Sequence, residues 1–424
     1  MTAAAAHQAI EAVYRIEAAR IIAGVARMVR DVGLAEELAQ DALVAALETW
    51  PTGGIPDNPG AWLMATAKNR ALDRLRQRKL HAQKEGALTY EIESLLADAQ
   101  PRIDAGLDDD IGDDLLRLVF TACHPVLSTD ARVALTLRLL GGLTTDEIAR
   151  AFLVPESTIA QRIVRAKRTL AEARVPFEVP GASERAVRLA SVLEVIYLVF
   201  NEGYSATSGE HWTRPTLCED ALRLGRILAE LAPSEAEVHG LVALMEIQAS
   251  RLRARVNAAG EPVLLLDQHR ARWDHLLIRR GLAALARAEA QGGALGPYAL
   301  QAAIAACHAR ALEASATDWP RIAALYDALA AVSPSPVVEL NRAVAVAMAF
   351  GPAAGLALVD ELRDDKALKG YHLLPSVRGD FLARLGRNAE AAAEFRRAAE
   401  LTRNERERAF LLARAQTAAA GEPQ

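Results

Sequence analysis

Residues 143–170 read LTTDEIARAFLVPESTIAQRIVRAKRTL, a pattern that predicts two short helices joined by a tight bend. Thr144 and Glu147 form the capping box that begins the first helix, and Leu153-Val154 make the turn. Pro155 fits the first turn of the second helix, because its missing N–H is not needed there. Apolar residues recurring every three or four positions predict one buried stripe on that helix: Ile159, Ile163, Ala166 and Leu170.

The opposite face of this second helix is polar and basic. Short hydroxyl and amide side chains near its N-terminus, followed by arginines, suit a helix placed end-on in a DNA major groove. Gln and Arg can make paired hydrogen bonds to base edges, while hydroxyls and further arginines hold phosphates. The plainer interpretation is a helical hairpin with a solvated basic face. We favour a DNA-binding helix-turn-helix, with these candidate DNA-contacting residues: Ser157, Thr158, Gln161, Arg162, Arg165 and Arg168.

The composition favours an all-α protein of several domains. The 424 residues are 51% hydrophobic but only 5% aromatic, and Ala-rich stretches with three-to-four spacing indicate helices. The net charge of −5 is too mild to identify a nucleic-acid partner. Cys123, Cys218 and Cys307 are odd in number and widely spaced, which suits reduced thiols. With no signal-peptide pattern and no uninterrupted apolar span, we expect a cytoplasmic protein with no membrane partner.

Residues 35–50 (AEELAQDALVAALETW) predict an amphipathic helix with an acidic outer face. The default interpretation is a face exposed to solvent. The functional interpretation is a face that docks on another protein. A loop rich in Gly and Pro, residues 51–60, should separate this helix from the next. The outer face consists of Glu36, Glu37, Gln40, Asp41 and Glu48.

Residues 61–79 (AWLMATAKNRALDRLRQRK) predict a strongly basic helix with one buried stripe. The face opposite that stripe carries an exposed aromatic beside amide and charged groups: Trp62, Asn69, Asp73 and Arg76. Cations can hold the phosphates of melting or single-stranded DNA while an aromatic ring stacks on a base. The alternative is that Trp62 turns inward against the preceding helices and leaves a merely basic surface.

Taken together, residues 35–76 resemble region 2, and residues 113–173 resemble region 4, of the extracytoplasmic-function (group 4) sigma factors of the sigma-70 family. The order and the spacing of the two motifs both match. The resemblance implies a region 2 domain at 9–80 that binds core RNA polymerase and the −10 element, and a region 4 domain at 113–178 that binds the −35 element. The linker at 81–112 is acidic, which by itself indicates only a flexible, solvated segment. By the same resemblance it would thread the nucleic-acid channel of the polymerase.

The resemblance also implies roles for individual residues. The positions that dock on the core polymerase would be Glu37, Gln40 and Asp41. The positions that open the −10 element and capture a base would be Asp57, Asn58, Trp62, Asn69 and Asp73, with Lys68, Arg74 and Arg76 on the DNA backbone. The helix that binds the −35 element would be the second helix of the helix-turn-helix.

More than half of the chain follows region 4. Residues 183–318 predict further amphipathic helices, and one segment concentrates charge around a tryptophan. An enzyme would need an activated nucleophile or a carboxylate pair beside a base, and no such arrangement is recognisable. We therefore expect a buried ion-pair network around Trp273 in this segment, formed from Asp267, His269, Arg270, Arg272 and Asp274.

Residues 319–424 carry a repeat with a period of 34 to 35 residues, which is typical of tetratricopeptide units. Small residues recur where helices would cross and aromatic residues where they would fill the core: Gly379, Leu382, Gly386, Ala391, Phe395, Ala398 and Leu401. Such units stack into a solenoid that commonly binds peptides or proteins. The whole chain thus resembles group 4 sigma factors with a tetratricopeptide-like extension, which is thought to modulate their activity.

We predict a non-enzymatic transcription initiation factor that needs no metal or cofactor. Its partners would be core RNA polymerase, promoter DNA and a possible protein or peptide ligand of the extension. The main alternative is a polymerase-independent DNA-binding regulator with a tetratricopeptide sensor. That alternative explains the helix-turn-helix and the repeats but leaves the acidic face of residues 35–50 and the Trp62 face without a role.

Overall fold

The structure of the chain is a computed structural model that describes residues 3–84, 111–152, 154–205, 208–209, 213–257 and 262–420. Its regular structure is helical apart from two strands of two residues each, which confirms the predicted all-α class. The chain divides into two compact units, Met1–Ile196 and Tyr197–Gln424.

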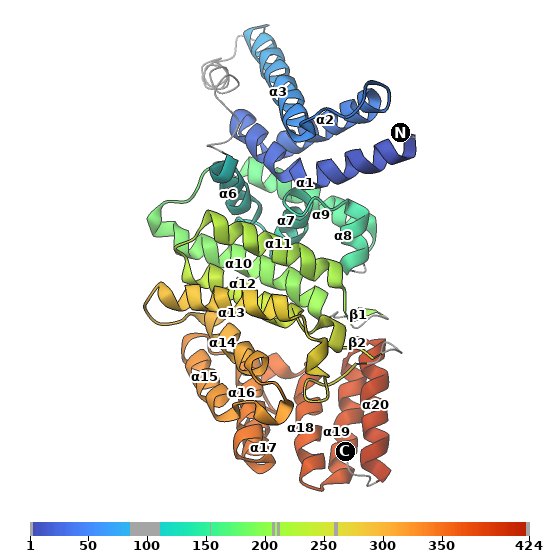
Figure 1. Cartoon of the computed structure of the whole chain (residues 1–424), viewed down its shortest axis with the longest axis vertical. Helices are drawn as coiled ribbons and strands as arrows, with labels where there is room; N and C mark the ends of the chain where they lie inside the picture. Colours follow the sequence, from blue (N-terminus) through green and yellow to red (C-terminus); the bar gives the residue numbers. More distant parts are fainter. Residues whose placement is uncertain are drawn as a thin grey trace. The chain divides into compact units, whose positions relative to one another are not determined.

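The first unit contains seven labelled helices and the beginning of an eighth, shown from blue to green in Figure 1. They are α1 (Ala3–Val29), α2 (Val32–Gly53), α3 (Pro59–Lys84), α6 (Ile111–Ala122), α7 (Thr129–Leu139), α8 (Thr145–Phe152), α9 (Glu156–Glu172) and α10 (Ala182–Tyr204). Helix α3 ends at Lys84 and α6 begins at Ile111, so the predicted acidic linker lies almost entirely outside the described residues.

Helices α1, α2 and α3 pack around a small apolar core. Each of the three contacts the other two, and Asp31 begins α2 by accepting a hydrogen bond of 3.0 Å from the Leu34 N–H. The loop predicted at 51–60 is shorter than expected, because Pro51 lies in the last turn of α2 and Pro59 begins α3. Proline fits the first turn of a helix because its missing N–H is not needed there, so composition alone did not separate the loop from the start of α3.

The first half of α10 belongs to the same unit as the helix-turn-helix. Arg188 donates a hydrogen bond of 2.9 Å to the Phe120 carbonyl, and the Ser191 hydroxyl donates one of 2.7 Å to the Cys123 carbonyl. Arg132 on α7 pairs with Glu194 at 3.0 Å. These contacts tie α10 to α6 and α7, beyond the boundary that we predicted for region 4 at residue 178.

The second unit is a succession of helices in which each packs on the next. Its helices are α11 (Pro215–Leu231), α12 (Ala236–Ala249), α13 (His275–Ala290), α14 (Pro297–Arg310), α15 (Trp319–Val332), α16 (Pro336–Phe350), α17 (Pro352–Glu361), α18 (Leu373–Arg384), α19 (Asn388–Leu401) and α20 (Glu405–Ala420). The short 3-10 turns are η1 (Leu252–Ala254), η2 (Arg270–Arg272), η3 (Ala314–Ala316) and η4 (Lys366–Leu368).

A parallel pair of short strands joins distant parts of the second unit. Strand β1 (Ser208–Gly209) pairs with β2 (Arg403–Asn404), with Ser208 opposite Arg403. Nothing in the local sequence predicts this pairing, because a two-residue strand carries no periodicity.

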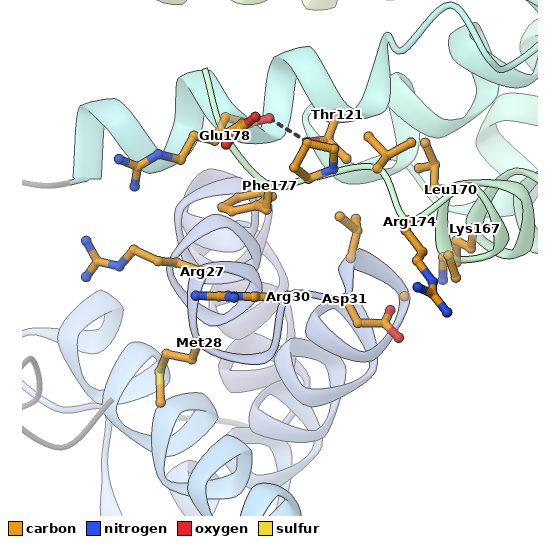
Figure 2. A pocket seen from close by; sticks show the side chains of 16 residues that line it. Arg27, Met28, Arg30, Asp31, Thr121, Lys167, Leu170, Arg174, Phe177 and Glu178 are labelled. Atoms are coloured by element: carbon orange, nitrogen blue, oxygen red, sulfur yellow. Dashed lines mark hydrogen bonds between the residues drawn. The ribbon is translucent and has the colours of Figure 1, made fainter. Parts of the chain in front are cut away.

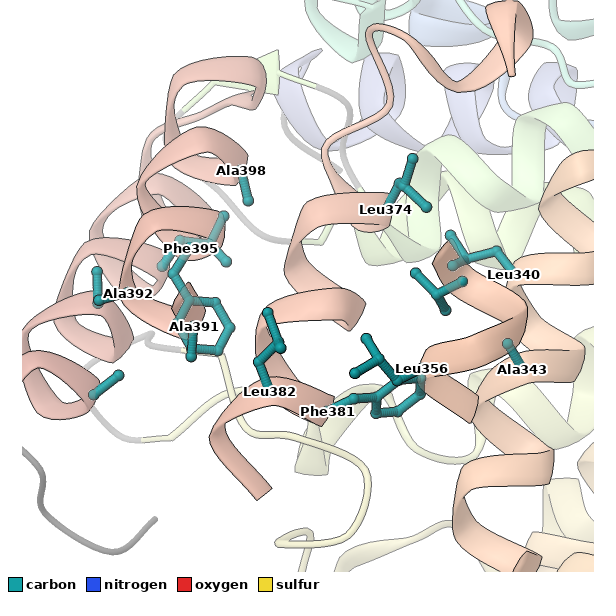
Figure 3. Close-up of a cluster of buried hydrophobic side chains, with 14 of the residues drawn as sticks. Leu340, Ala343, Leu356, Leu374, Phe381, Leu382, Ala391, Ala392, Phe395 and Ala398 are labelled. Atoms are coloured by element: carbon teal, nitrogen blue, oxygen red, sulfur yellow. The ribbon is translucent and has the colours of Figure 1, made fainter. Parts of the chain in front are cut away.

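The C-terminal helices share an apolar core built on small residues and phenylalanines (Figure 3). Phe381 and Phe395 are 1% and 0% exposed, and a Cβ on Gly379 would lie only 2.9 Å from the Phe395 ring. Gly351 and Gly386 follow α16 and α18 with φ of 103° and 75°, a left-handed conformation that favours glycine. The tetratricopeptide-like character of 319–424 remains a prediction, and this small-residue packing supports it.

Candidate nucleic-acid interface

Helices α8 and α9 form the predicted helix-turn-helix. The Thr144 hydroxyl accepts a hydrogen bond of 3.1 Å from the Glu147 N–H, and the Glu147 carboxylate accepts one of 2.8 Å from the Thr144 N–H. This reciprocal pair confirms the capping box. Pro155 is the N-cap of α9 rather than its first residue, and Leu153 lies outside the described residues. The predicted stripe is buried on α9: Ile159, Ile163, Ala166 and Leu170.

The outer face of α9 displays most of the predicted DNA-contacting residues. Four of them are exposed and Thr158 and Arg162 are half-buried; the exposed four are Ser157, Gln161, Arg165 and Arg168. Arg162 pairs with Asp130 of α7 at 3.0 Å, and Arg168 pairs with Glu172 at 3.4 Å. Ion pairs of this exposed kind are weak and exchange readily for other anions such as phosphate.

Val164 also lies on the outer face of α9, although our sequence analysis did not include it. Its side chain is 64% exposed, and it stands three residues after Gln161 and four before Arg168 on the same helix. The signal was present in the sequence, since those spacings share one helix face. An exposed apolar side chain there offers a contact to a thymine methyl group.

The outer face of α3 is also polar. Asn58 caps this helix by accepting a hydrogen bond of 3.0 Å from the Ala61 N–H, and Asp73 pairs with Arg76 at 3.3 Å. Of the predicted −10 residues, the exposed ones are Asp57, Asn58, Asn69, Asp73, Arg74 and Arg76.

Two other predicted residues of α3 lie apart from that exposed face. Lys68 is half-buried, and burial together with the nearby Arg27 lowers the pKa of its ammonium. Trp62 is half-buried and packs edge-on against Trp50, with ring centroids 5.2 Å apart. The alternative in which Trp62 turns toward the preceding helix therefore describes this structure.

The acidic face that we predicted on residues 35–50 is only partly exposed. Glu37 and Asp41 are exposed, and Asp41 lies 3.4 Å from Arg70 on α3. Glu36 does not lie on the outer face as predicted, because its side chain is 4% exposed and lies in the interior. Helical spacing places Glu36 among polar neighbours, but it cannot show that another domain covers one edge of the helix.

Glu36 lies at an interface between α1–α3 and α6–α9. Its carboxylate accepts a hydrogen bond of 2.7 Å from Arg138 of α7 and pairs with Lys167 of α9. Gln40 donates a further bond of 2.7 Å to the same carboxylate. Burial raises the pKa of Tyr14 to about 12, and the neighbouring Glu36 adds to the rise.

Asp114 of α6 is a second buried carboxylate at this interface, and it pairs with a cation from the opposite domain. Its side chain is 2% exposed and pairs with Arg27 of α1 at 3.3 Å and with Arg117 of α6 at 2.6 Å. A buried carboxylate is tolerated only when it is paired and hydrogen-bonded. Glu36 and Asp114 thus each bind cations that reach them from across the interface.

The charged segment around Trp273 does not form the ion-pair network that we expected. Arg270 is 9% exposed and donates hydrogen bonds to the His308 and Ala311 carbonyls, both of 2.6 Å. Its guanidinium also stacks 5.0 Å from the Trp273 ring. Asp274 instead caps α13, and the exposed members of the segment are Asp267, His269 and Arg272. Carbonyl oxygens and an aromatic face therefore replace the expected carboxylates.

Three further observations bear on ligands and environment. The three cysteines are buried free thiols. Among the described residues there is no group of three or more His, Cys, Asp and Glu side chains suited to a metal ion. Within the same residues, no helix is both long and apolar enough to cross a membrane.

Comparison with known protein families gives matches to three segments of the chain. Residues 13–81 match the family Sigma-70 region 2, residues 117–170 match Sigma-70, region 4, and residues 188–289 match a family of unknown function, DUF6596. An uncharacterized protein of Rhizobium meliloti (strain 1021) is 45% identical over 390 residues, which are 91% of this chain and 90% of that protein.

Shorter matches include proteins that are named as ECF RNA polymerase sigma factors. The ECF RNA polymerase sigma factor SigK of Mycobacterium ulcerans (strain Agy99) is 33% identical over 159 residues, which are 36% of this chain and 78% of that protein. The probable ECF RNA polymerase sigma factor SigI of Mycobacterium tuberculosis (strain H37Rv) is 27% identical over 188 residues, 44% of this chain and 62% of that protein. No solved structure matches the chain significantly. The chain belongs to the family of ECF RNA polymerase sigma factors.

Proposed function

We propose that this chain is an alternative sigma factor that binds core RNA polymerase, recognises −35 and −10 promoter elements and initiates transcription. One observation carries the proposal most directly. Two exposed polar helix faces, on α9 and on α3, occur in two separately matched sigma regions of one chain. A polymerase-independent regulator would need the first face but not the second.

Helix α9 would bind the −35 element. Gln161 and Arg165 are exposed on its outer face, where amide and guanidinium groups can each make paired bonds to a base edge. Val164 would pack against a thymine methyl between them. Arg162 and Arg168 would exchange their present carboxylate partners for phosphates and so set the position of the helix.

Helix α3 and the residues before it would open the −10 element. Asn69 and Asp73 are exposed polar groups able to hydrogen-bond an unpaired base, and Arg74 and Arg76 are exposed cations for the backbone. The half-buried Trp62 offers the part of its ring that Trp50 does not cover. On α2, the exposed Glu37 and Asp41 would contact the polymerase core together with Gln40.

In vitro transcription with core RNA polymerase on the promoter of the chain's own gene tests this proposal. Asn69→Ala and Arg165→Ala should each reduce the run-off product by about 5-fold to 150-fold, since one paired base contact is worth about 1–3 kcal/mol. Matched controls are Asn341→Ala and Arg185→Ala, which replace the same residue types at exposed positions outside both faces. A full-length protein that yields no product and does not co-purify with core polymerase would favour the polymerase-independent regulator.

We also propose that the extension regulates this activity and that its helical repeats bind a protein or peptide. The comparison to make is the full chain against residues 1–196. A cut at residue 182 would remove Arg188, Ser191 and Glu194, which hold α10 on α6 and α7. Equal promoter-specific transcription by the two chains would contradict a regulatory extension.

A further inference from the structure

We propose that the outer face of α13, in the second unit, binds the phosphate backbone of duplex DNA outside the −35 and −10 elements and without reading sequence. The opposite side of α13 is buried, so the side chains of the outer face stay at the surface. Any role of this contact at a promoter rests on the proposed sigma function, whereas the binding to DNA does not. The outer face consists of exposed residues only: Leu276, Arg279, Arg280, Ala283, Ala286, Arg287 and Ala290.

The segment that contains α13 has a charge opposite to that of the whole chain. Residues 251–287 contain eight arginines against three carboxylates, in a chain whose net charge is −5. The outer face of α13 carries three of these arginines and no acidic residue. Charges of one sign gathered on one surface attract a partner of the opposite sign to that place. The partner of this face is therefore anionic.

The three arginines of the face hold no carboxylate. Among the described residues, none of Arg279, Arg280 and Arg287 forms an ion pair. The positions three and four residues away from them on the helix hold His, Leu, Ala or Gln, so no pair can form along the helix. By contrast, Arg342 and Arg387 of the same unit each pair with a glutamate three residues away, at 2.8 Å and 2.7 Å. The charge on α13 is thus available to an external anion.

A cavity in the first unit is also lined by cations, but three of them are already paired inside the protein (Figure 2). Arg27 and Arg117 both bind the buried carboxylate of Asp114. Lys167 binds the buried carboxylate of Glu36. An anion in that cavity would compete with these carboxylates, so the outer face of α13 is the better anion site.

The side chains between the arginines favour DNA over a protein partner. Three of them are alanines, and Leu276 is the one large apolar residue of the face. Protein–protein interfaces centre on aromatic and apolar anchors, whereas protein–DNA interfaces are more polar and much more positively charged. Small side chains between the arginines also allow the helix to approach a DNA backbone closely.

The spacing of the arginines fits a DNA strand. Arg279 and Arg287 stand eight residues apart, which is about 12 Å at about 1.5 Å per residue of helix. A strand of B-DNA advances about 3.4 Å along its axis per phosphate, so this length passes about three or four phosphates. Guanidinium groups match phosphate oxygens in charge and in planar geometry. Each arginine of the face can therefore hold a different phosphate.

Fluorescence anisotropy with the full chain and a labelled duplex of scrambled sequence tests the site without polymerase. The slope of log affinity against log salt concentration, measured between about 50 and 200 mM salt, reports the number of phosphates held. Replacing all three arginines, as Arg279→Gln, Arg280→Gln and Arg287→Gln, should make the slope shallower by roughly 2.7, at about 0.9 per phosphate contact. Glutamine removes the charge while keeping a similar helix propensity.

The matched control is Arg363→Gln with Arg396→Gln and Arg397→Gln, which removes three exposed arginines from other parts of the second unit. It changes the net charge by the same amount and should keep the slope of the original chain. Equal slopes for the two triple variants would overturn the site. So would an unchanged slope of the α13 variant together with weaker co-purification with core polymerase, because the face would then bind a protein.

A DNA-cleaving iron chelate on Ala283→Cys tests the contact in the complex with core polymerase and promoter DNA. The native thiols are buried, so the reagent should attach at the introduced position. We expect strand cleavage outside the −35 and −10 elements, and none from Ala357→Cys, an exposed position of α17. Equal cleavage from the two positions would overturn this contact. A complex that does not transcribe would instead contradict the proposed function, and the salt slope would still decide whether α13 binds DNA.

Discussion

In the first unit, buried Glu36 and Asp114 bind cationic side chains across a domain interface, whereas in the second unit buried Arg270 binds backbone carbonyls and a tryptophan face. The two arrangements differ in the free energy that is needed to separate the charged group from its partners. Charged partners at a domain interface are each hydrated when the domains separate, which offsets part of the lost attraction. An arginine held by carbonyls inside one helical scaffold loses those partners only when that scaffold unfolds.

The C-terminal helices of the second unit are also held together by closely packed apolar side chains. In the second unit, Phe395 fills a space that Gly379 leaves open, and both lie within the core of the C-terminal helices. Burial of this kind is lost entirely when helices separate. The contact between regions 2 and 4 therefore includes buried charged pairs, while the C-terminal helices are held by a closely packed apolar core.

The largest expected effect concerns the core of the extension. Phe395→Ala should lower the free energy of unfolding by about 3–5 kcal/mol, because it removes a fully buried ring and leaves a cavity. Urea unfolding followed by circular dichroism measures this change. Leu312→Ala, at a side chain that is 86% exposed, should change the same quantity by less than about 0.5 kcal/mol. Equal effects of the two variants would show that the ring does not support this core.

A second variant addresses the interface between regions 2 and 4. Glu36→Ala leaves Arg138 and Lys167 near a buried site without their carboxylate, and loss of one partner of such a group costs about 3 kcal/mol. Hydrogen–deuterium exchange should become faster in α2 and α9 but not in α18 and α19. Glu37→Ala, at the exposed neighbouring position, is the control. Faster exchange throughout the chain would contradict a local interface.

A change of one pH unit should have the smallest effect of the three. Burial lowers the pKa of His308 to about 3, and Arg251 and Arg270 add to the drop. Below its unfolded pKa of about 6.5, the unfolded chain binds a proton that the folded chain does not, so stability falls as pH decreases from about 6.5 to 3. The slope attributable to this group is at most about 1.4 kcal/mol per pH unit.

His308→Gln should remove that slope from the urea unfolding midpoint measured between pH 4 and pH 7 (about the range in which the unfolded His titrates). The exposed His275→Gln is the control and should retain the slope. An identical pH dependence for His308→Gln and the original chain would mean that His308 is protonated in the folded state as readily as in the unfolded one.

Local features of the fold could be predicted from the sequence because their causes are local. The Thr144–Glu147 capping box and the buried stripe from Ile159 to Leu170 depend on spacing within single helices, and both are confirmed. The exposed residues of α9 follow from the same periodicity. The start of α3 was harder to predict, as Pro59 shows, because a proline is tolerated in the first turn of a helix as well as in a loop.

Helical periodicity was enough to predict the all-α class, the helix-turn-helix and the polar faces of α3 and α9, since it separates buried from exposed residues within one element. Three features could be seen only in the folded chain: Glu36 is buried, Trp62 packs on Trp50, and Arg270 bonds to carbonyls. Each of these depends on a partner remote in sequence or on an element whose placement periodicity does not encode.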